Sequence, residues 1–105
     1  MGVSAMDWDF ELLTDNHTSE IKRLVNEYSF YVGKQRVGIK IHIDTYGYYQ
    51  METSHFYRGK NKAGVYISSA ANFESEKEAL LNAKKQLLSF YDGEGEWKEN
   101  DSYHL

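Results

Sequence analysis

The sequence contains no cysteine, and its apolar runs are only a few residues long. Without cysteine, the chain has no disulfide, no thiolate nucleophile and no cysteine-ligated metal, and a reducing cytoplasm is the expected location. The apolar runs are too short for a transmembrane helix. The N-terminus lacks the basic, apolar and small-residue progression of a signal peptide, so we expect no membrane partner.

At 105 residues and 12.2 kDa, with 41% hydrophobic and 27% charged residues, the chain has the size and composition of one globular domain. We assign residues 6–93 to that domain. Residues 1–5 are either a native flexible N-terminus or a cloning remnant, and they are left out of the fold prediction. Residues 94–105 are acidic and polar, and we expect them to form a flexible tail.

Two segments near the N-terminus show opposite periodicities. Met6, Trp8, Phe10 and Leu12 alternate with acidic residues, which predicts a half-buried strand. The apolar residues of the next segment follow at helical spacing and predict an amphipathic helix over about 18–29, although residues 28–33 also alternate. The helical positions are Ile21, Leu24, Val25 and Tyr28.

The rest of the chain predicts three strands and a second helix. The strands are expected at about 37–44, 48–58 and 65–69. Ser75 and Glu78 form a Ser-x-x-Glu capping box that starts a helix over about 76–91. The expected fold class is α+β: a three-stranded antiparallel meander, with the N-terminal strand as a fourth at one edge, and two helices packed on one face.

The first hairpin of the meander has a predictable register. A three-residue loop, residues 45–47, with Gly47 in the left-handed conformation, sets Asp44 opposite Tyr48. Lys40 then faces Glu52, so opposite charges meet across the strands. A shift of one residue would set isoleucines against polar side chains, which a buried face disfavours.

This register predicts an aromatic outer face on the sheet. Side chains that point away from the helices would form a candidate binding surface, because exposed aromatic rings supply contact area at low entropic cost. The alternative is that the tail, the N-terminal strand or a second copy covers these rings. The predicted residues of the aromatic outer face are Tyr48, Gln50, Phe56, Tyr66 and Ser68.

A cluster of cations is predicted at one end of the meander. The strand at about 37–44 begins at this end, and the loop after Arg58 lies beside it. Such a cluster can dock an anionic partner, or it can be a solvated loop cluster that only favours solubility. The acidic tail leaves from the same end and could fold over the cluster. We name it the basic end, and its residues are Lys34, Arg36, Arg58, Lys60 and Lys62.

The sequence shows no pattern typical of catalysis or metal binding. The four histidines have no metal-ligand spacing. His42 shares a predicted strand face with Asp44 and Glu52, but exposed polar strand residues explain that arrangement better. The serines near His55 and His42 lack an elbow or an orienting third group. We therefore expect no enzyme activity, no cofactor and no metal.

The leading hypothesis is a small cytoplasmic binding protein without catalytic activity that acts through a protein–protein interface. An inhibitor or adaptor from a phage or mobile element would fit a chain of this size. The first alternative is single-stranded nucleic-acid binding, with bases stacked on the aromatic outer face and phosphates at the basic end. Glu52 lies on that face and disfavours it. The second alternative is a homodimer with a structural role.

Overall fold

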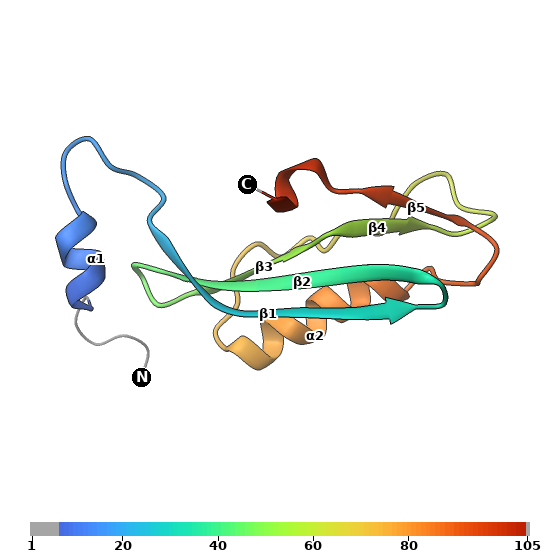
Figure 1. Cartoon of the computed structure of the whole chain (residues 1–105), viewed down its shortest axis with the longest axis horizontal. Helices are drawn as coiled ribbons and strands as arrows, with labels where there is room; N and C mark the ends of the chain where they lie inside the picture. The colour runs from blue at the N-terminus through green and yellow to red at the C-terminus, as the bar shows by residue number, and fades with distance from the viewer. Residues whose placement is uncertain (1–6, 105) are drawn as a thin grey trace.

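A three-stranded antiparallel sheet in the order β1-β2-β3 forms the body of the protein (Figure 1). The computed structural model describes residues 7–104. In it β1 spans Lys22–Val32, β2 spans Gln35–Asp44 and β3 spans Tyr49–Thr53. The sheet is a meander, because β2 pairs in antiparallel fashion with both neighbours. The predicted α+β fold class and a three-stranded antiparallel meander are confirmed, but the third strand of the meander is β1 and not the strand predicted at 65–69.

The remaining elements are arranged around this sheet. Strand β4 (His55–Arg58) pairs with β5 (Glu96–Glu99) in a second sheet. Helix α2 (Glu76–Leu88) covers one face of the larger sheet, whereas α1 (Trp8–Leu13) lies beyond the end of that sheet (Figure 1). A short 3-10 helix, η1 (Asp101–His104), follows β5.

The core lies between α2 and β2. Ala79, Ala83 and Leu87 are fully buried on the inner side of α2, and they pack with Ile39 and Ile41 of β2. The helix starts at the predicted N-cap, where the Ser75 hydroxyl accepts the Glu78 N–H at 3.1 Å. It ends three residues before the predicted Tyr91. In residues 7–104, no helix has the length and apolarity to span a bilayer.

The predicted β2–β3 register is confirmed. Lys40 faces Glu52, Ile41 faces Met51 and His42 faces Gln50. Gly47 has φ +85°, and its N–H donates to the Asp44 carbonyl at 3.2 Å. The left-handed glycine closes the three-residue loop, and this fixes which side chains face the helix.

The helix predicted over 18–29 is wrong, because this segment forms most of β1. The strand carries a bulge between Leu24 and Asn26. The bulge shifts the alternation by one residue, so that Val25 and Phe30 both pack against the core. That shift imitates helical spacing in the sequence. The β-forming residues Tyr28–Val32 and the Gly33 turn, with φ +61°, favour the hairpin instead.

The strand predicted from Met6 to Leu12 is also wrong where the structure describes it, since residues 8–13 form α1. Met6 and residues 1–5 lie outside the described residues. Trp8 and Leu12 have the i, i+4 spacing of a helix as well as the alternation of a strand. The acidic residues Asp9 and Glu11 in the first turn also complement the helix dipole.

The strand predicted at 65–69 does not form, because β5 takes its place beside β4. The backbone N–H of Ser68 donates instead to the Gln86 side chain at 2.9 Å. β4 pairs with β5, a strand from the region that was expected to be a flexible tail. Trp97 of β5 faces Tyr57 of β4 in this pair, and the two rings meet edge to face at 4.8 Å. The apolar contact explains why this part of the tail packs.

Candidate functional site

Helix α1 is attached to the sheet through one side only. Phe10 is 1% exposed, and the Arg23 guanidinium lies 5.0 Å above its ring. Arg23 also pairs with Asp9 at 2.8 Å and with Asp7 at 3.1 Å. The hydrogen bond from Arg23 is the main reason why the pKa of Asp9 lies below its ordinary value. The aromatic anchor and the ion pairs hold the helix against the start of β1.

The opposite side of α1 exposes large apolar side chains to solvent. Trp8 is 78% exposed and Leu12 is 76% exposed. Residues four apart lie on one helix face, and Phe10 lies on the other. Tyr46, in the β2–β3 turn, is 84% exposed. We name this surface the α1 end, and its exposed apolar residues are Trp8, Leu12, Leu13, Tyr46 and Tyr48.

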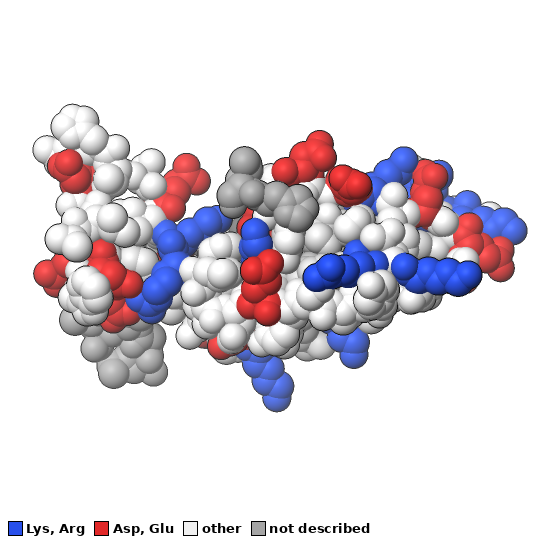
Figure 2. Space-filling model, viewed as in Figure 1, with Lys and Arg blue, Asp and Glu red and all other residues white. Residues whose placement is uncertain are grey.

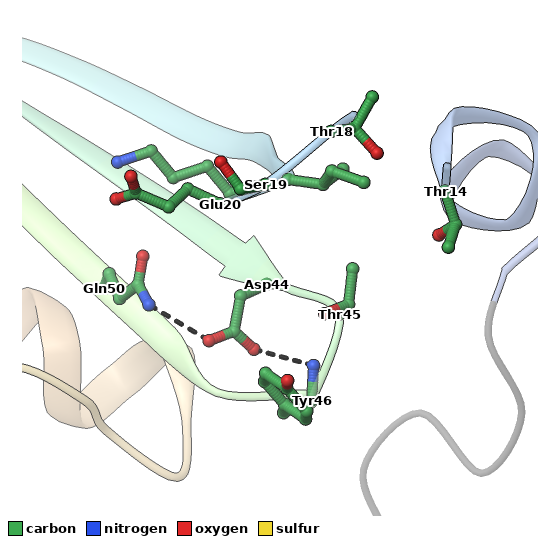
Figure 3. Close-up of a pocket in the computed structure, with 10 residues that line it drawn as sticks. Thr14, Thr18, Ser19, Glu20, Asp44, Thr45, Tyr46 and Gln50 are labelled. Carbon is green, nitrogen blue, oxygen red and sulfur yellow. Dashed lines mark hydrogen bonds between the residues drawn. The ribbon is translucent and has the colours of Figure 1, made fainter. Parts of the chain in front are cut away.

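A cavity of about 750 Å³ joins α1 to the β2–β3 turn. In Figure 3, Thr14 at the end of α1 lies across this space from Thr45 and Tyr46. The turn is held from inside by Asp44, whose carboxylate accepts the N–H of Tyr46 at 2.9 Å and a hydrogen bond from Gln50 at 3.0 Å. The exposed Tyr46 therefore belongs to a turn that hydrogen bonds to Asp44 hold in place.

The predicted aromatic outer face is divided between three places. Gln50, Phe56 and Ser68 line one cavity of about 420 Å³ beside the chain that follows β4. Tyr66 packs edge-on against Phe90 at 5.5 Å. Tyr48 is 46% exposed and belongs to the α1 end. The break between β3 and β4 and the irregular path of 65–69 separate residues that one long strand would have kept together.

The C-terminal segment covers part of the outer sheet face. Tyr103 is 4% exposed, and its hydroxyl donates to Glu27 at 3.2 Å. Lys40 donates to the Tyr103 carbonyl and lies 4.4 Å from its ring centroid. Burial raises the pKa of Tyr103 to about 12. Gly38 leaves space for this ring, since a Cβ there would lie 2.5 Å from the Tyr103 hydroxyl.

Two of the five residues of the basic end are paired with acidic side chains. Arg58 contacts Glu96 at 2.7 Å, and Lys60 contacts Glu94 at 3.0 Å. The Arg58 hydrogen bond is also the main reason why the pKa of Glu96 is lowered. Figure 2 shows Lys or Arg beside Asp or Glu at the end of the molecule opposite α1. The C-terminal segment thus supplies acidic partners for two of these cations.

The other three predicted cations have separate environments. Lys62 lies over the Phe90 ring at 4.8 Å. Arg36 donates from Nε to the Ser29 hydroxyl at 3.0 Å. Lys34 is exposed in the β1–β2 turn. A continuous positive surface therefore does not form from the five predicted residues.

Ser54 and His55 form structural contacts. The Ser54 hydroxyl lies 2.7 Å from His55 Nδ1 and also accepts the N–H of Gly38 at 2.7 Å, so it ties β2 to the β3–β4 connection. Burial is the main reason why the pKa of His42 is lowered. Asp44, the predicted neighbour of His42, accepts hydrogen bonds within the β2–β3 turn instead. Within residues 7–104, no group of three or more His, Asp or Glu side chains is arranged to hold a metal ion.

Trp8, Leu12 and Tyr46 were not among the predicted binding residues. The i, i+4 spacing of Trp8 and Leu12 could have indicated a helix face, and the central position of Tyr46 in a hairpin loop could have indicated exposure. Comparison of the chain with protein-family models, curated proteins and solved structures finds no match. The functional argument therefore depends on the residues of this chain.

Proposed function

We propose that the protein is a non-catalytic, cytoplasmic binding module whose α1 end docks on a larger protein, as an inhibitor or adaptor does. The observation that carries the proposal is the exposure of Trp8, Leu12 and Tyr46, each of them more than three-quarters accessible. Tryptophan and tyrosine dominate the energy of protein interfaces. Large exposed apolar side chains gathered at one end are typical of an interaction site.

The chemistry of the α1 end indicates the kind of partner. Trp8 and Leu12 form an i, i+4 pair, the arrangement by which a helix fills an apolar groove. The exposed acidic residue Glu11 lies beside this pair, whereas Asp7 and Asp9 are already bound to Arg23. A protein groove with an apolar floor and a basic rim complements the pair and Glu11. The internally bonded β2–β3 turn would add Tyr46 without a large ordering cost.

The nucleic-acid alternative has less support. Phosphate binding requires cations that are available to replace counterions. Arg58 and Lys60 are instead paired with Glu96 and Glu94. The aromatic residues that were expected to stack on bases are also separated, with Tyr66 against Phe90.

The test is a comparison of three proteins as bait in extract from the source cells. Wild type, Trp8→Ala/Leu12→Ala and the control Ile67→Ala/Leu81→Ala are immobilised, and captured proteins are identified by mass spectrometry. Ile67 and Leu81 are 61% and 49% exposed and lie outside the α1 end. The captured protein is then purified, and its affinity for each bait is measured by calorimetry.

We expect the α1-end double variant to lose at least about tenfold in affinity, since two anchor residues are removed. The control should bind like wild type. Equal affinity of all three baits for the purified protein would overturn the proposal. Circular dichroism on each variant confirms that the fold is retained.

A further inference from the structure

Strand β1 has one edge paired with β2 and one edge open. It lies at the margin of the sheet. Among the described residues, β2 is the strand that pairs with it. Figure 1 shows β1 at the front of the sheet with no strand on its other side. An open edge is a template for another strand unless charges, a bulge or a covering loop blocks it.

The hydrogen bonds of Gly38 show which backbone groups reach this edge. Gly38 donates its N–H to the Ser54 hydroxyl at 2.7 Å, and its carbonyl accepts the Ser54 N–H at 2.9 Å. The backbone of Gly38 therefore faces β3. Because N–H and C=O groups alternate in direction along an antiparallel strand, those of Val37 and Ile39 face β1.

Ile39 lies opposite Tyr28, and Val37 lies opposite Phe30. Tyr28 and Phe30 thus direct their backbone groups toward β2. The residues between and beside them direct their backbone N–H and C=O groups to the open edge, because the direction of these groups alternates along β1 as well. These residues are Glu27, Ser29 and Tyr31.

The protection of the edge stops at the bulge. Lys22 and Arg23 precede the irregularity between Leu24 and Asn26, and both a bulge and basic side chains discourage strand pairing. The segment from residue 26 to 32 is regular, and it carries a single charge, on Glu27.

The aromatic residues of this segment are incompletely covered. Tyr28 shares a sheet face with the buried Ile39, yet it is 36% exposed. The reason is that α2 packs mainly over β3, β4 and β2. Tyr31, on the other face, is 67% exposed. The regular segment therefore has unpaired backbone groups and accessible rings together.

We propose that β1 pairs with β1 of a second copy of this chain, antiparallel and with the two-fold axis at Ser29. The two three-stranded sheets then become one continuous sheet. This surface is separate from the α1 end, so the inference is independent of the proposed function.

The sequence of β1 supports a second copy as the occupant. With Ser29 on the axis, each open-edge residue meets another, since Glu27 lies opposite Tyr31 of the second copy. Tyr28 lies opposite Phe30 of the second copy, an aromatic pair that favours antiparallel strands. An axis at Glu27 would set two carboxylates against each other and would bring the bulge into the pairing. With an axis at Tyr28 or Phe30, one of the open-edge residues would pair with a residue of the second copy that lies outside the regular segment.

The first measurement is the mass and amide exchange of the full chain in solution. Light scattering should give twice 12.2 kDa at high concentration and a concentration-dependent fall toward 12.2 kDa on dilution. In hydrogen exchange followed by NMR, the amides of Glu27, Ser29 and Tyr31 should be protected in the dimer and exchange faster on dilution. Those of Tyr28 and Phe30 should stay protected throughout, since they bond to β2 in either state. A monomer at all concentrations, or fast exchange of the three edge amides in a dimer, would overturn the proposal.

Two variants locate the interface. Ser29→Pro removes a backbone N–H that makes no hydrogen bond to β2. Tyr28→Lys places a charge in the regular segment of the open edge. Both variants should be monomers. The matched control Tyr46→Lys makes the same substitution at the α1 end and should remain dimeric. If Ser29→Pro fails to fold, Tyr28→Lys decides the matter. A dimer that survives Tyr28→Lys or is broken by Tyr46→Lys would place the contact elsewhere.

Discussion

The two ends of the molecule use aromatic residues in different ways. At the end that holds β4, β5 and the close of α2, Tyr57, Tyr91 and Trp97 pack on one another with ring centroids 4.8–6.0 Å apart. At the α1 end, Phe10 alone of the described aromatic residues of α1 is buried, and Trp8 points into solvent. The sequence has one tryptophan in each region. The difference shows that aromatic content by itself does not separate core from binding surface.

The charges differ between the two ends as well. Arg58 and Lys60 at the packed end are paired with acidic side chains of the C-terminal segment. At the α1 end, Arg23 binds Asp7 and Asp9 and so attaches the helix, while the exposed Glu11 lies beside the apolar residues. Ion pairs join segments of the fold at both ends, but only at the α1 end does the attached segment expose large apolar side chains.

The largest expected difference comes from the same substitution made at both ends. Trp97→Ala should lower the free energy of unfolding by roughly 2–4 kcal/mol, because the half-buried ring contacts Tyr57, Tyr91 and the core. Trp8→Ala should change it by less than about 0.5 kcal/mol, since the side chain is exposed. Urea unfolding measures both. Equal losses would contradict the division into a packed end and an exposed end.

A smaller effect is expected at the contact that closes the outer sheet face. Gly38→Ala should destabilise the protein by about 1–3 kcal/mol, because the added methyl group would overlap the buried Tyr103 hydroxyl. Gly64→Ala is the matched control, since no atom lies within 4 Å of a Cβ at that position. Thermal unfolding of the two variants gives the comparison. If Gly38→Ala unfolds like Gly64→Ala, the C-terminal segment does not pack on the sheet as described.

The packed end should also respond to acid. The Asp92 carboxylate accepts the Tyr57 hydroxyl at 2.7 Å and the Lys60 N–H at 2.9 Å, and these hydrogen bonds hold its pKa below the ordinary value of 3.8. Because the folded pKa is the lower one, this contribution is complete above pH 3.8 and is lost as the pH falls below it.

Asp92→Asn should therefore flatten the fall of the melting temperature in the acid range. The control Asp9→Asn removes a carboxylate with a lowered pKa at the α1 end, and it should alter the slope less because α1 makes few contacts with the body. A slope that Asp92→Asn leaves unchanged would mean that the hydrogen bonds of Asp92 do not stabilise the fold.

The smallest effect is expected from the surface ion pair at the packed end. Lys60 and Glu94 are 61% and 65% exposed, so Lys60→Ala should change the free energy of unfolding by less than about 1 kcal/mol. The same variant tests the nucleic-acid alternative, by titration of labelled single-stranded oligonucleotide at low and moderate salt. Tight, salt-sensitive binding by wild type that Lys60→Ala weakens would favour that alternative over protein binding.

The sequence predicted the parts of the fold that local patterns determine. The β2–β3 register follows from Gly47 and the alternating isoleucines, and the start of α2 follows from Ser75. The β1 prediction failed because a bulge at Val25 imitates helical spacing. The pairing of β4 with β5 depends on contacts 38–44 residues apart, such as Arg58 with Glu96 and His55 with Glu99. No short-range pattern reports such contacts.

The candidate site was predicted less well than the fold. Tyr48 was selected and belongs to the α1 end, but Trp8 and Leu12 were assigned to a strand, so their exposure could not be inferred. Exposure at this end results from a tertiary feature, the attachment of α1 through Phe10 and Arg23 beyond the end of the sheet. The sequence does not specify where a short helix stands relative to a sheet.

The central claim is that Trp8 is a free contact surface while Trp97 is part of the packed end. Trp97→Phe leaves Trp8 as the only tryptophan, and Trp8→Phe leaves Trp97. In the free protein, acrylamide should quench Trp8 fluorescence efficiently and Trp97 fluorescence weakly. On addition of the purified captured protein, the Trp8 emission should shift to shorter wavelength and become protected from acrylamide, and that of Trp97 should not change. A bound complex in which Trp8 stays fully quenchable would contradict the account.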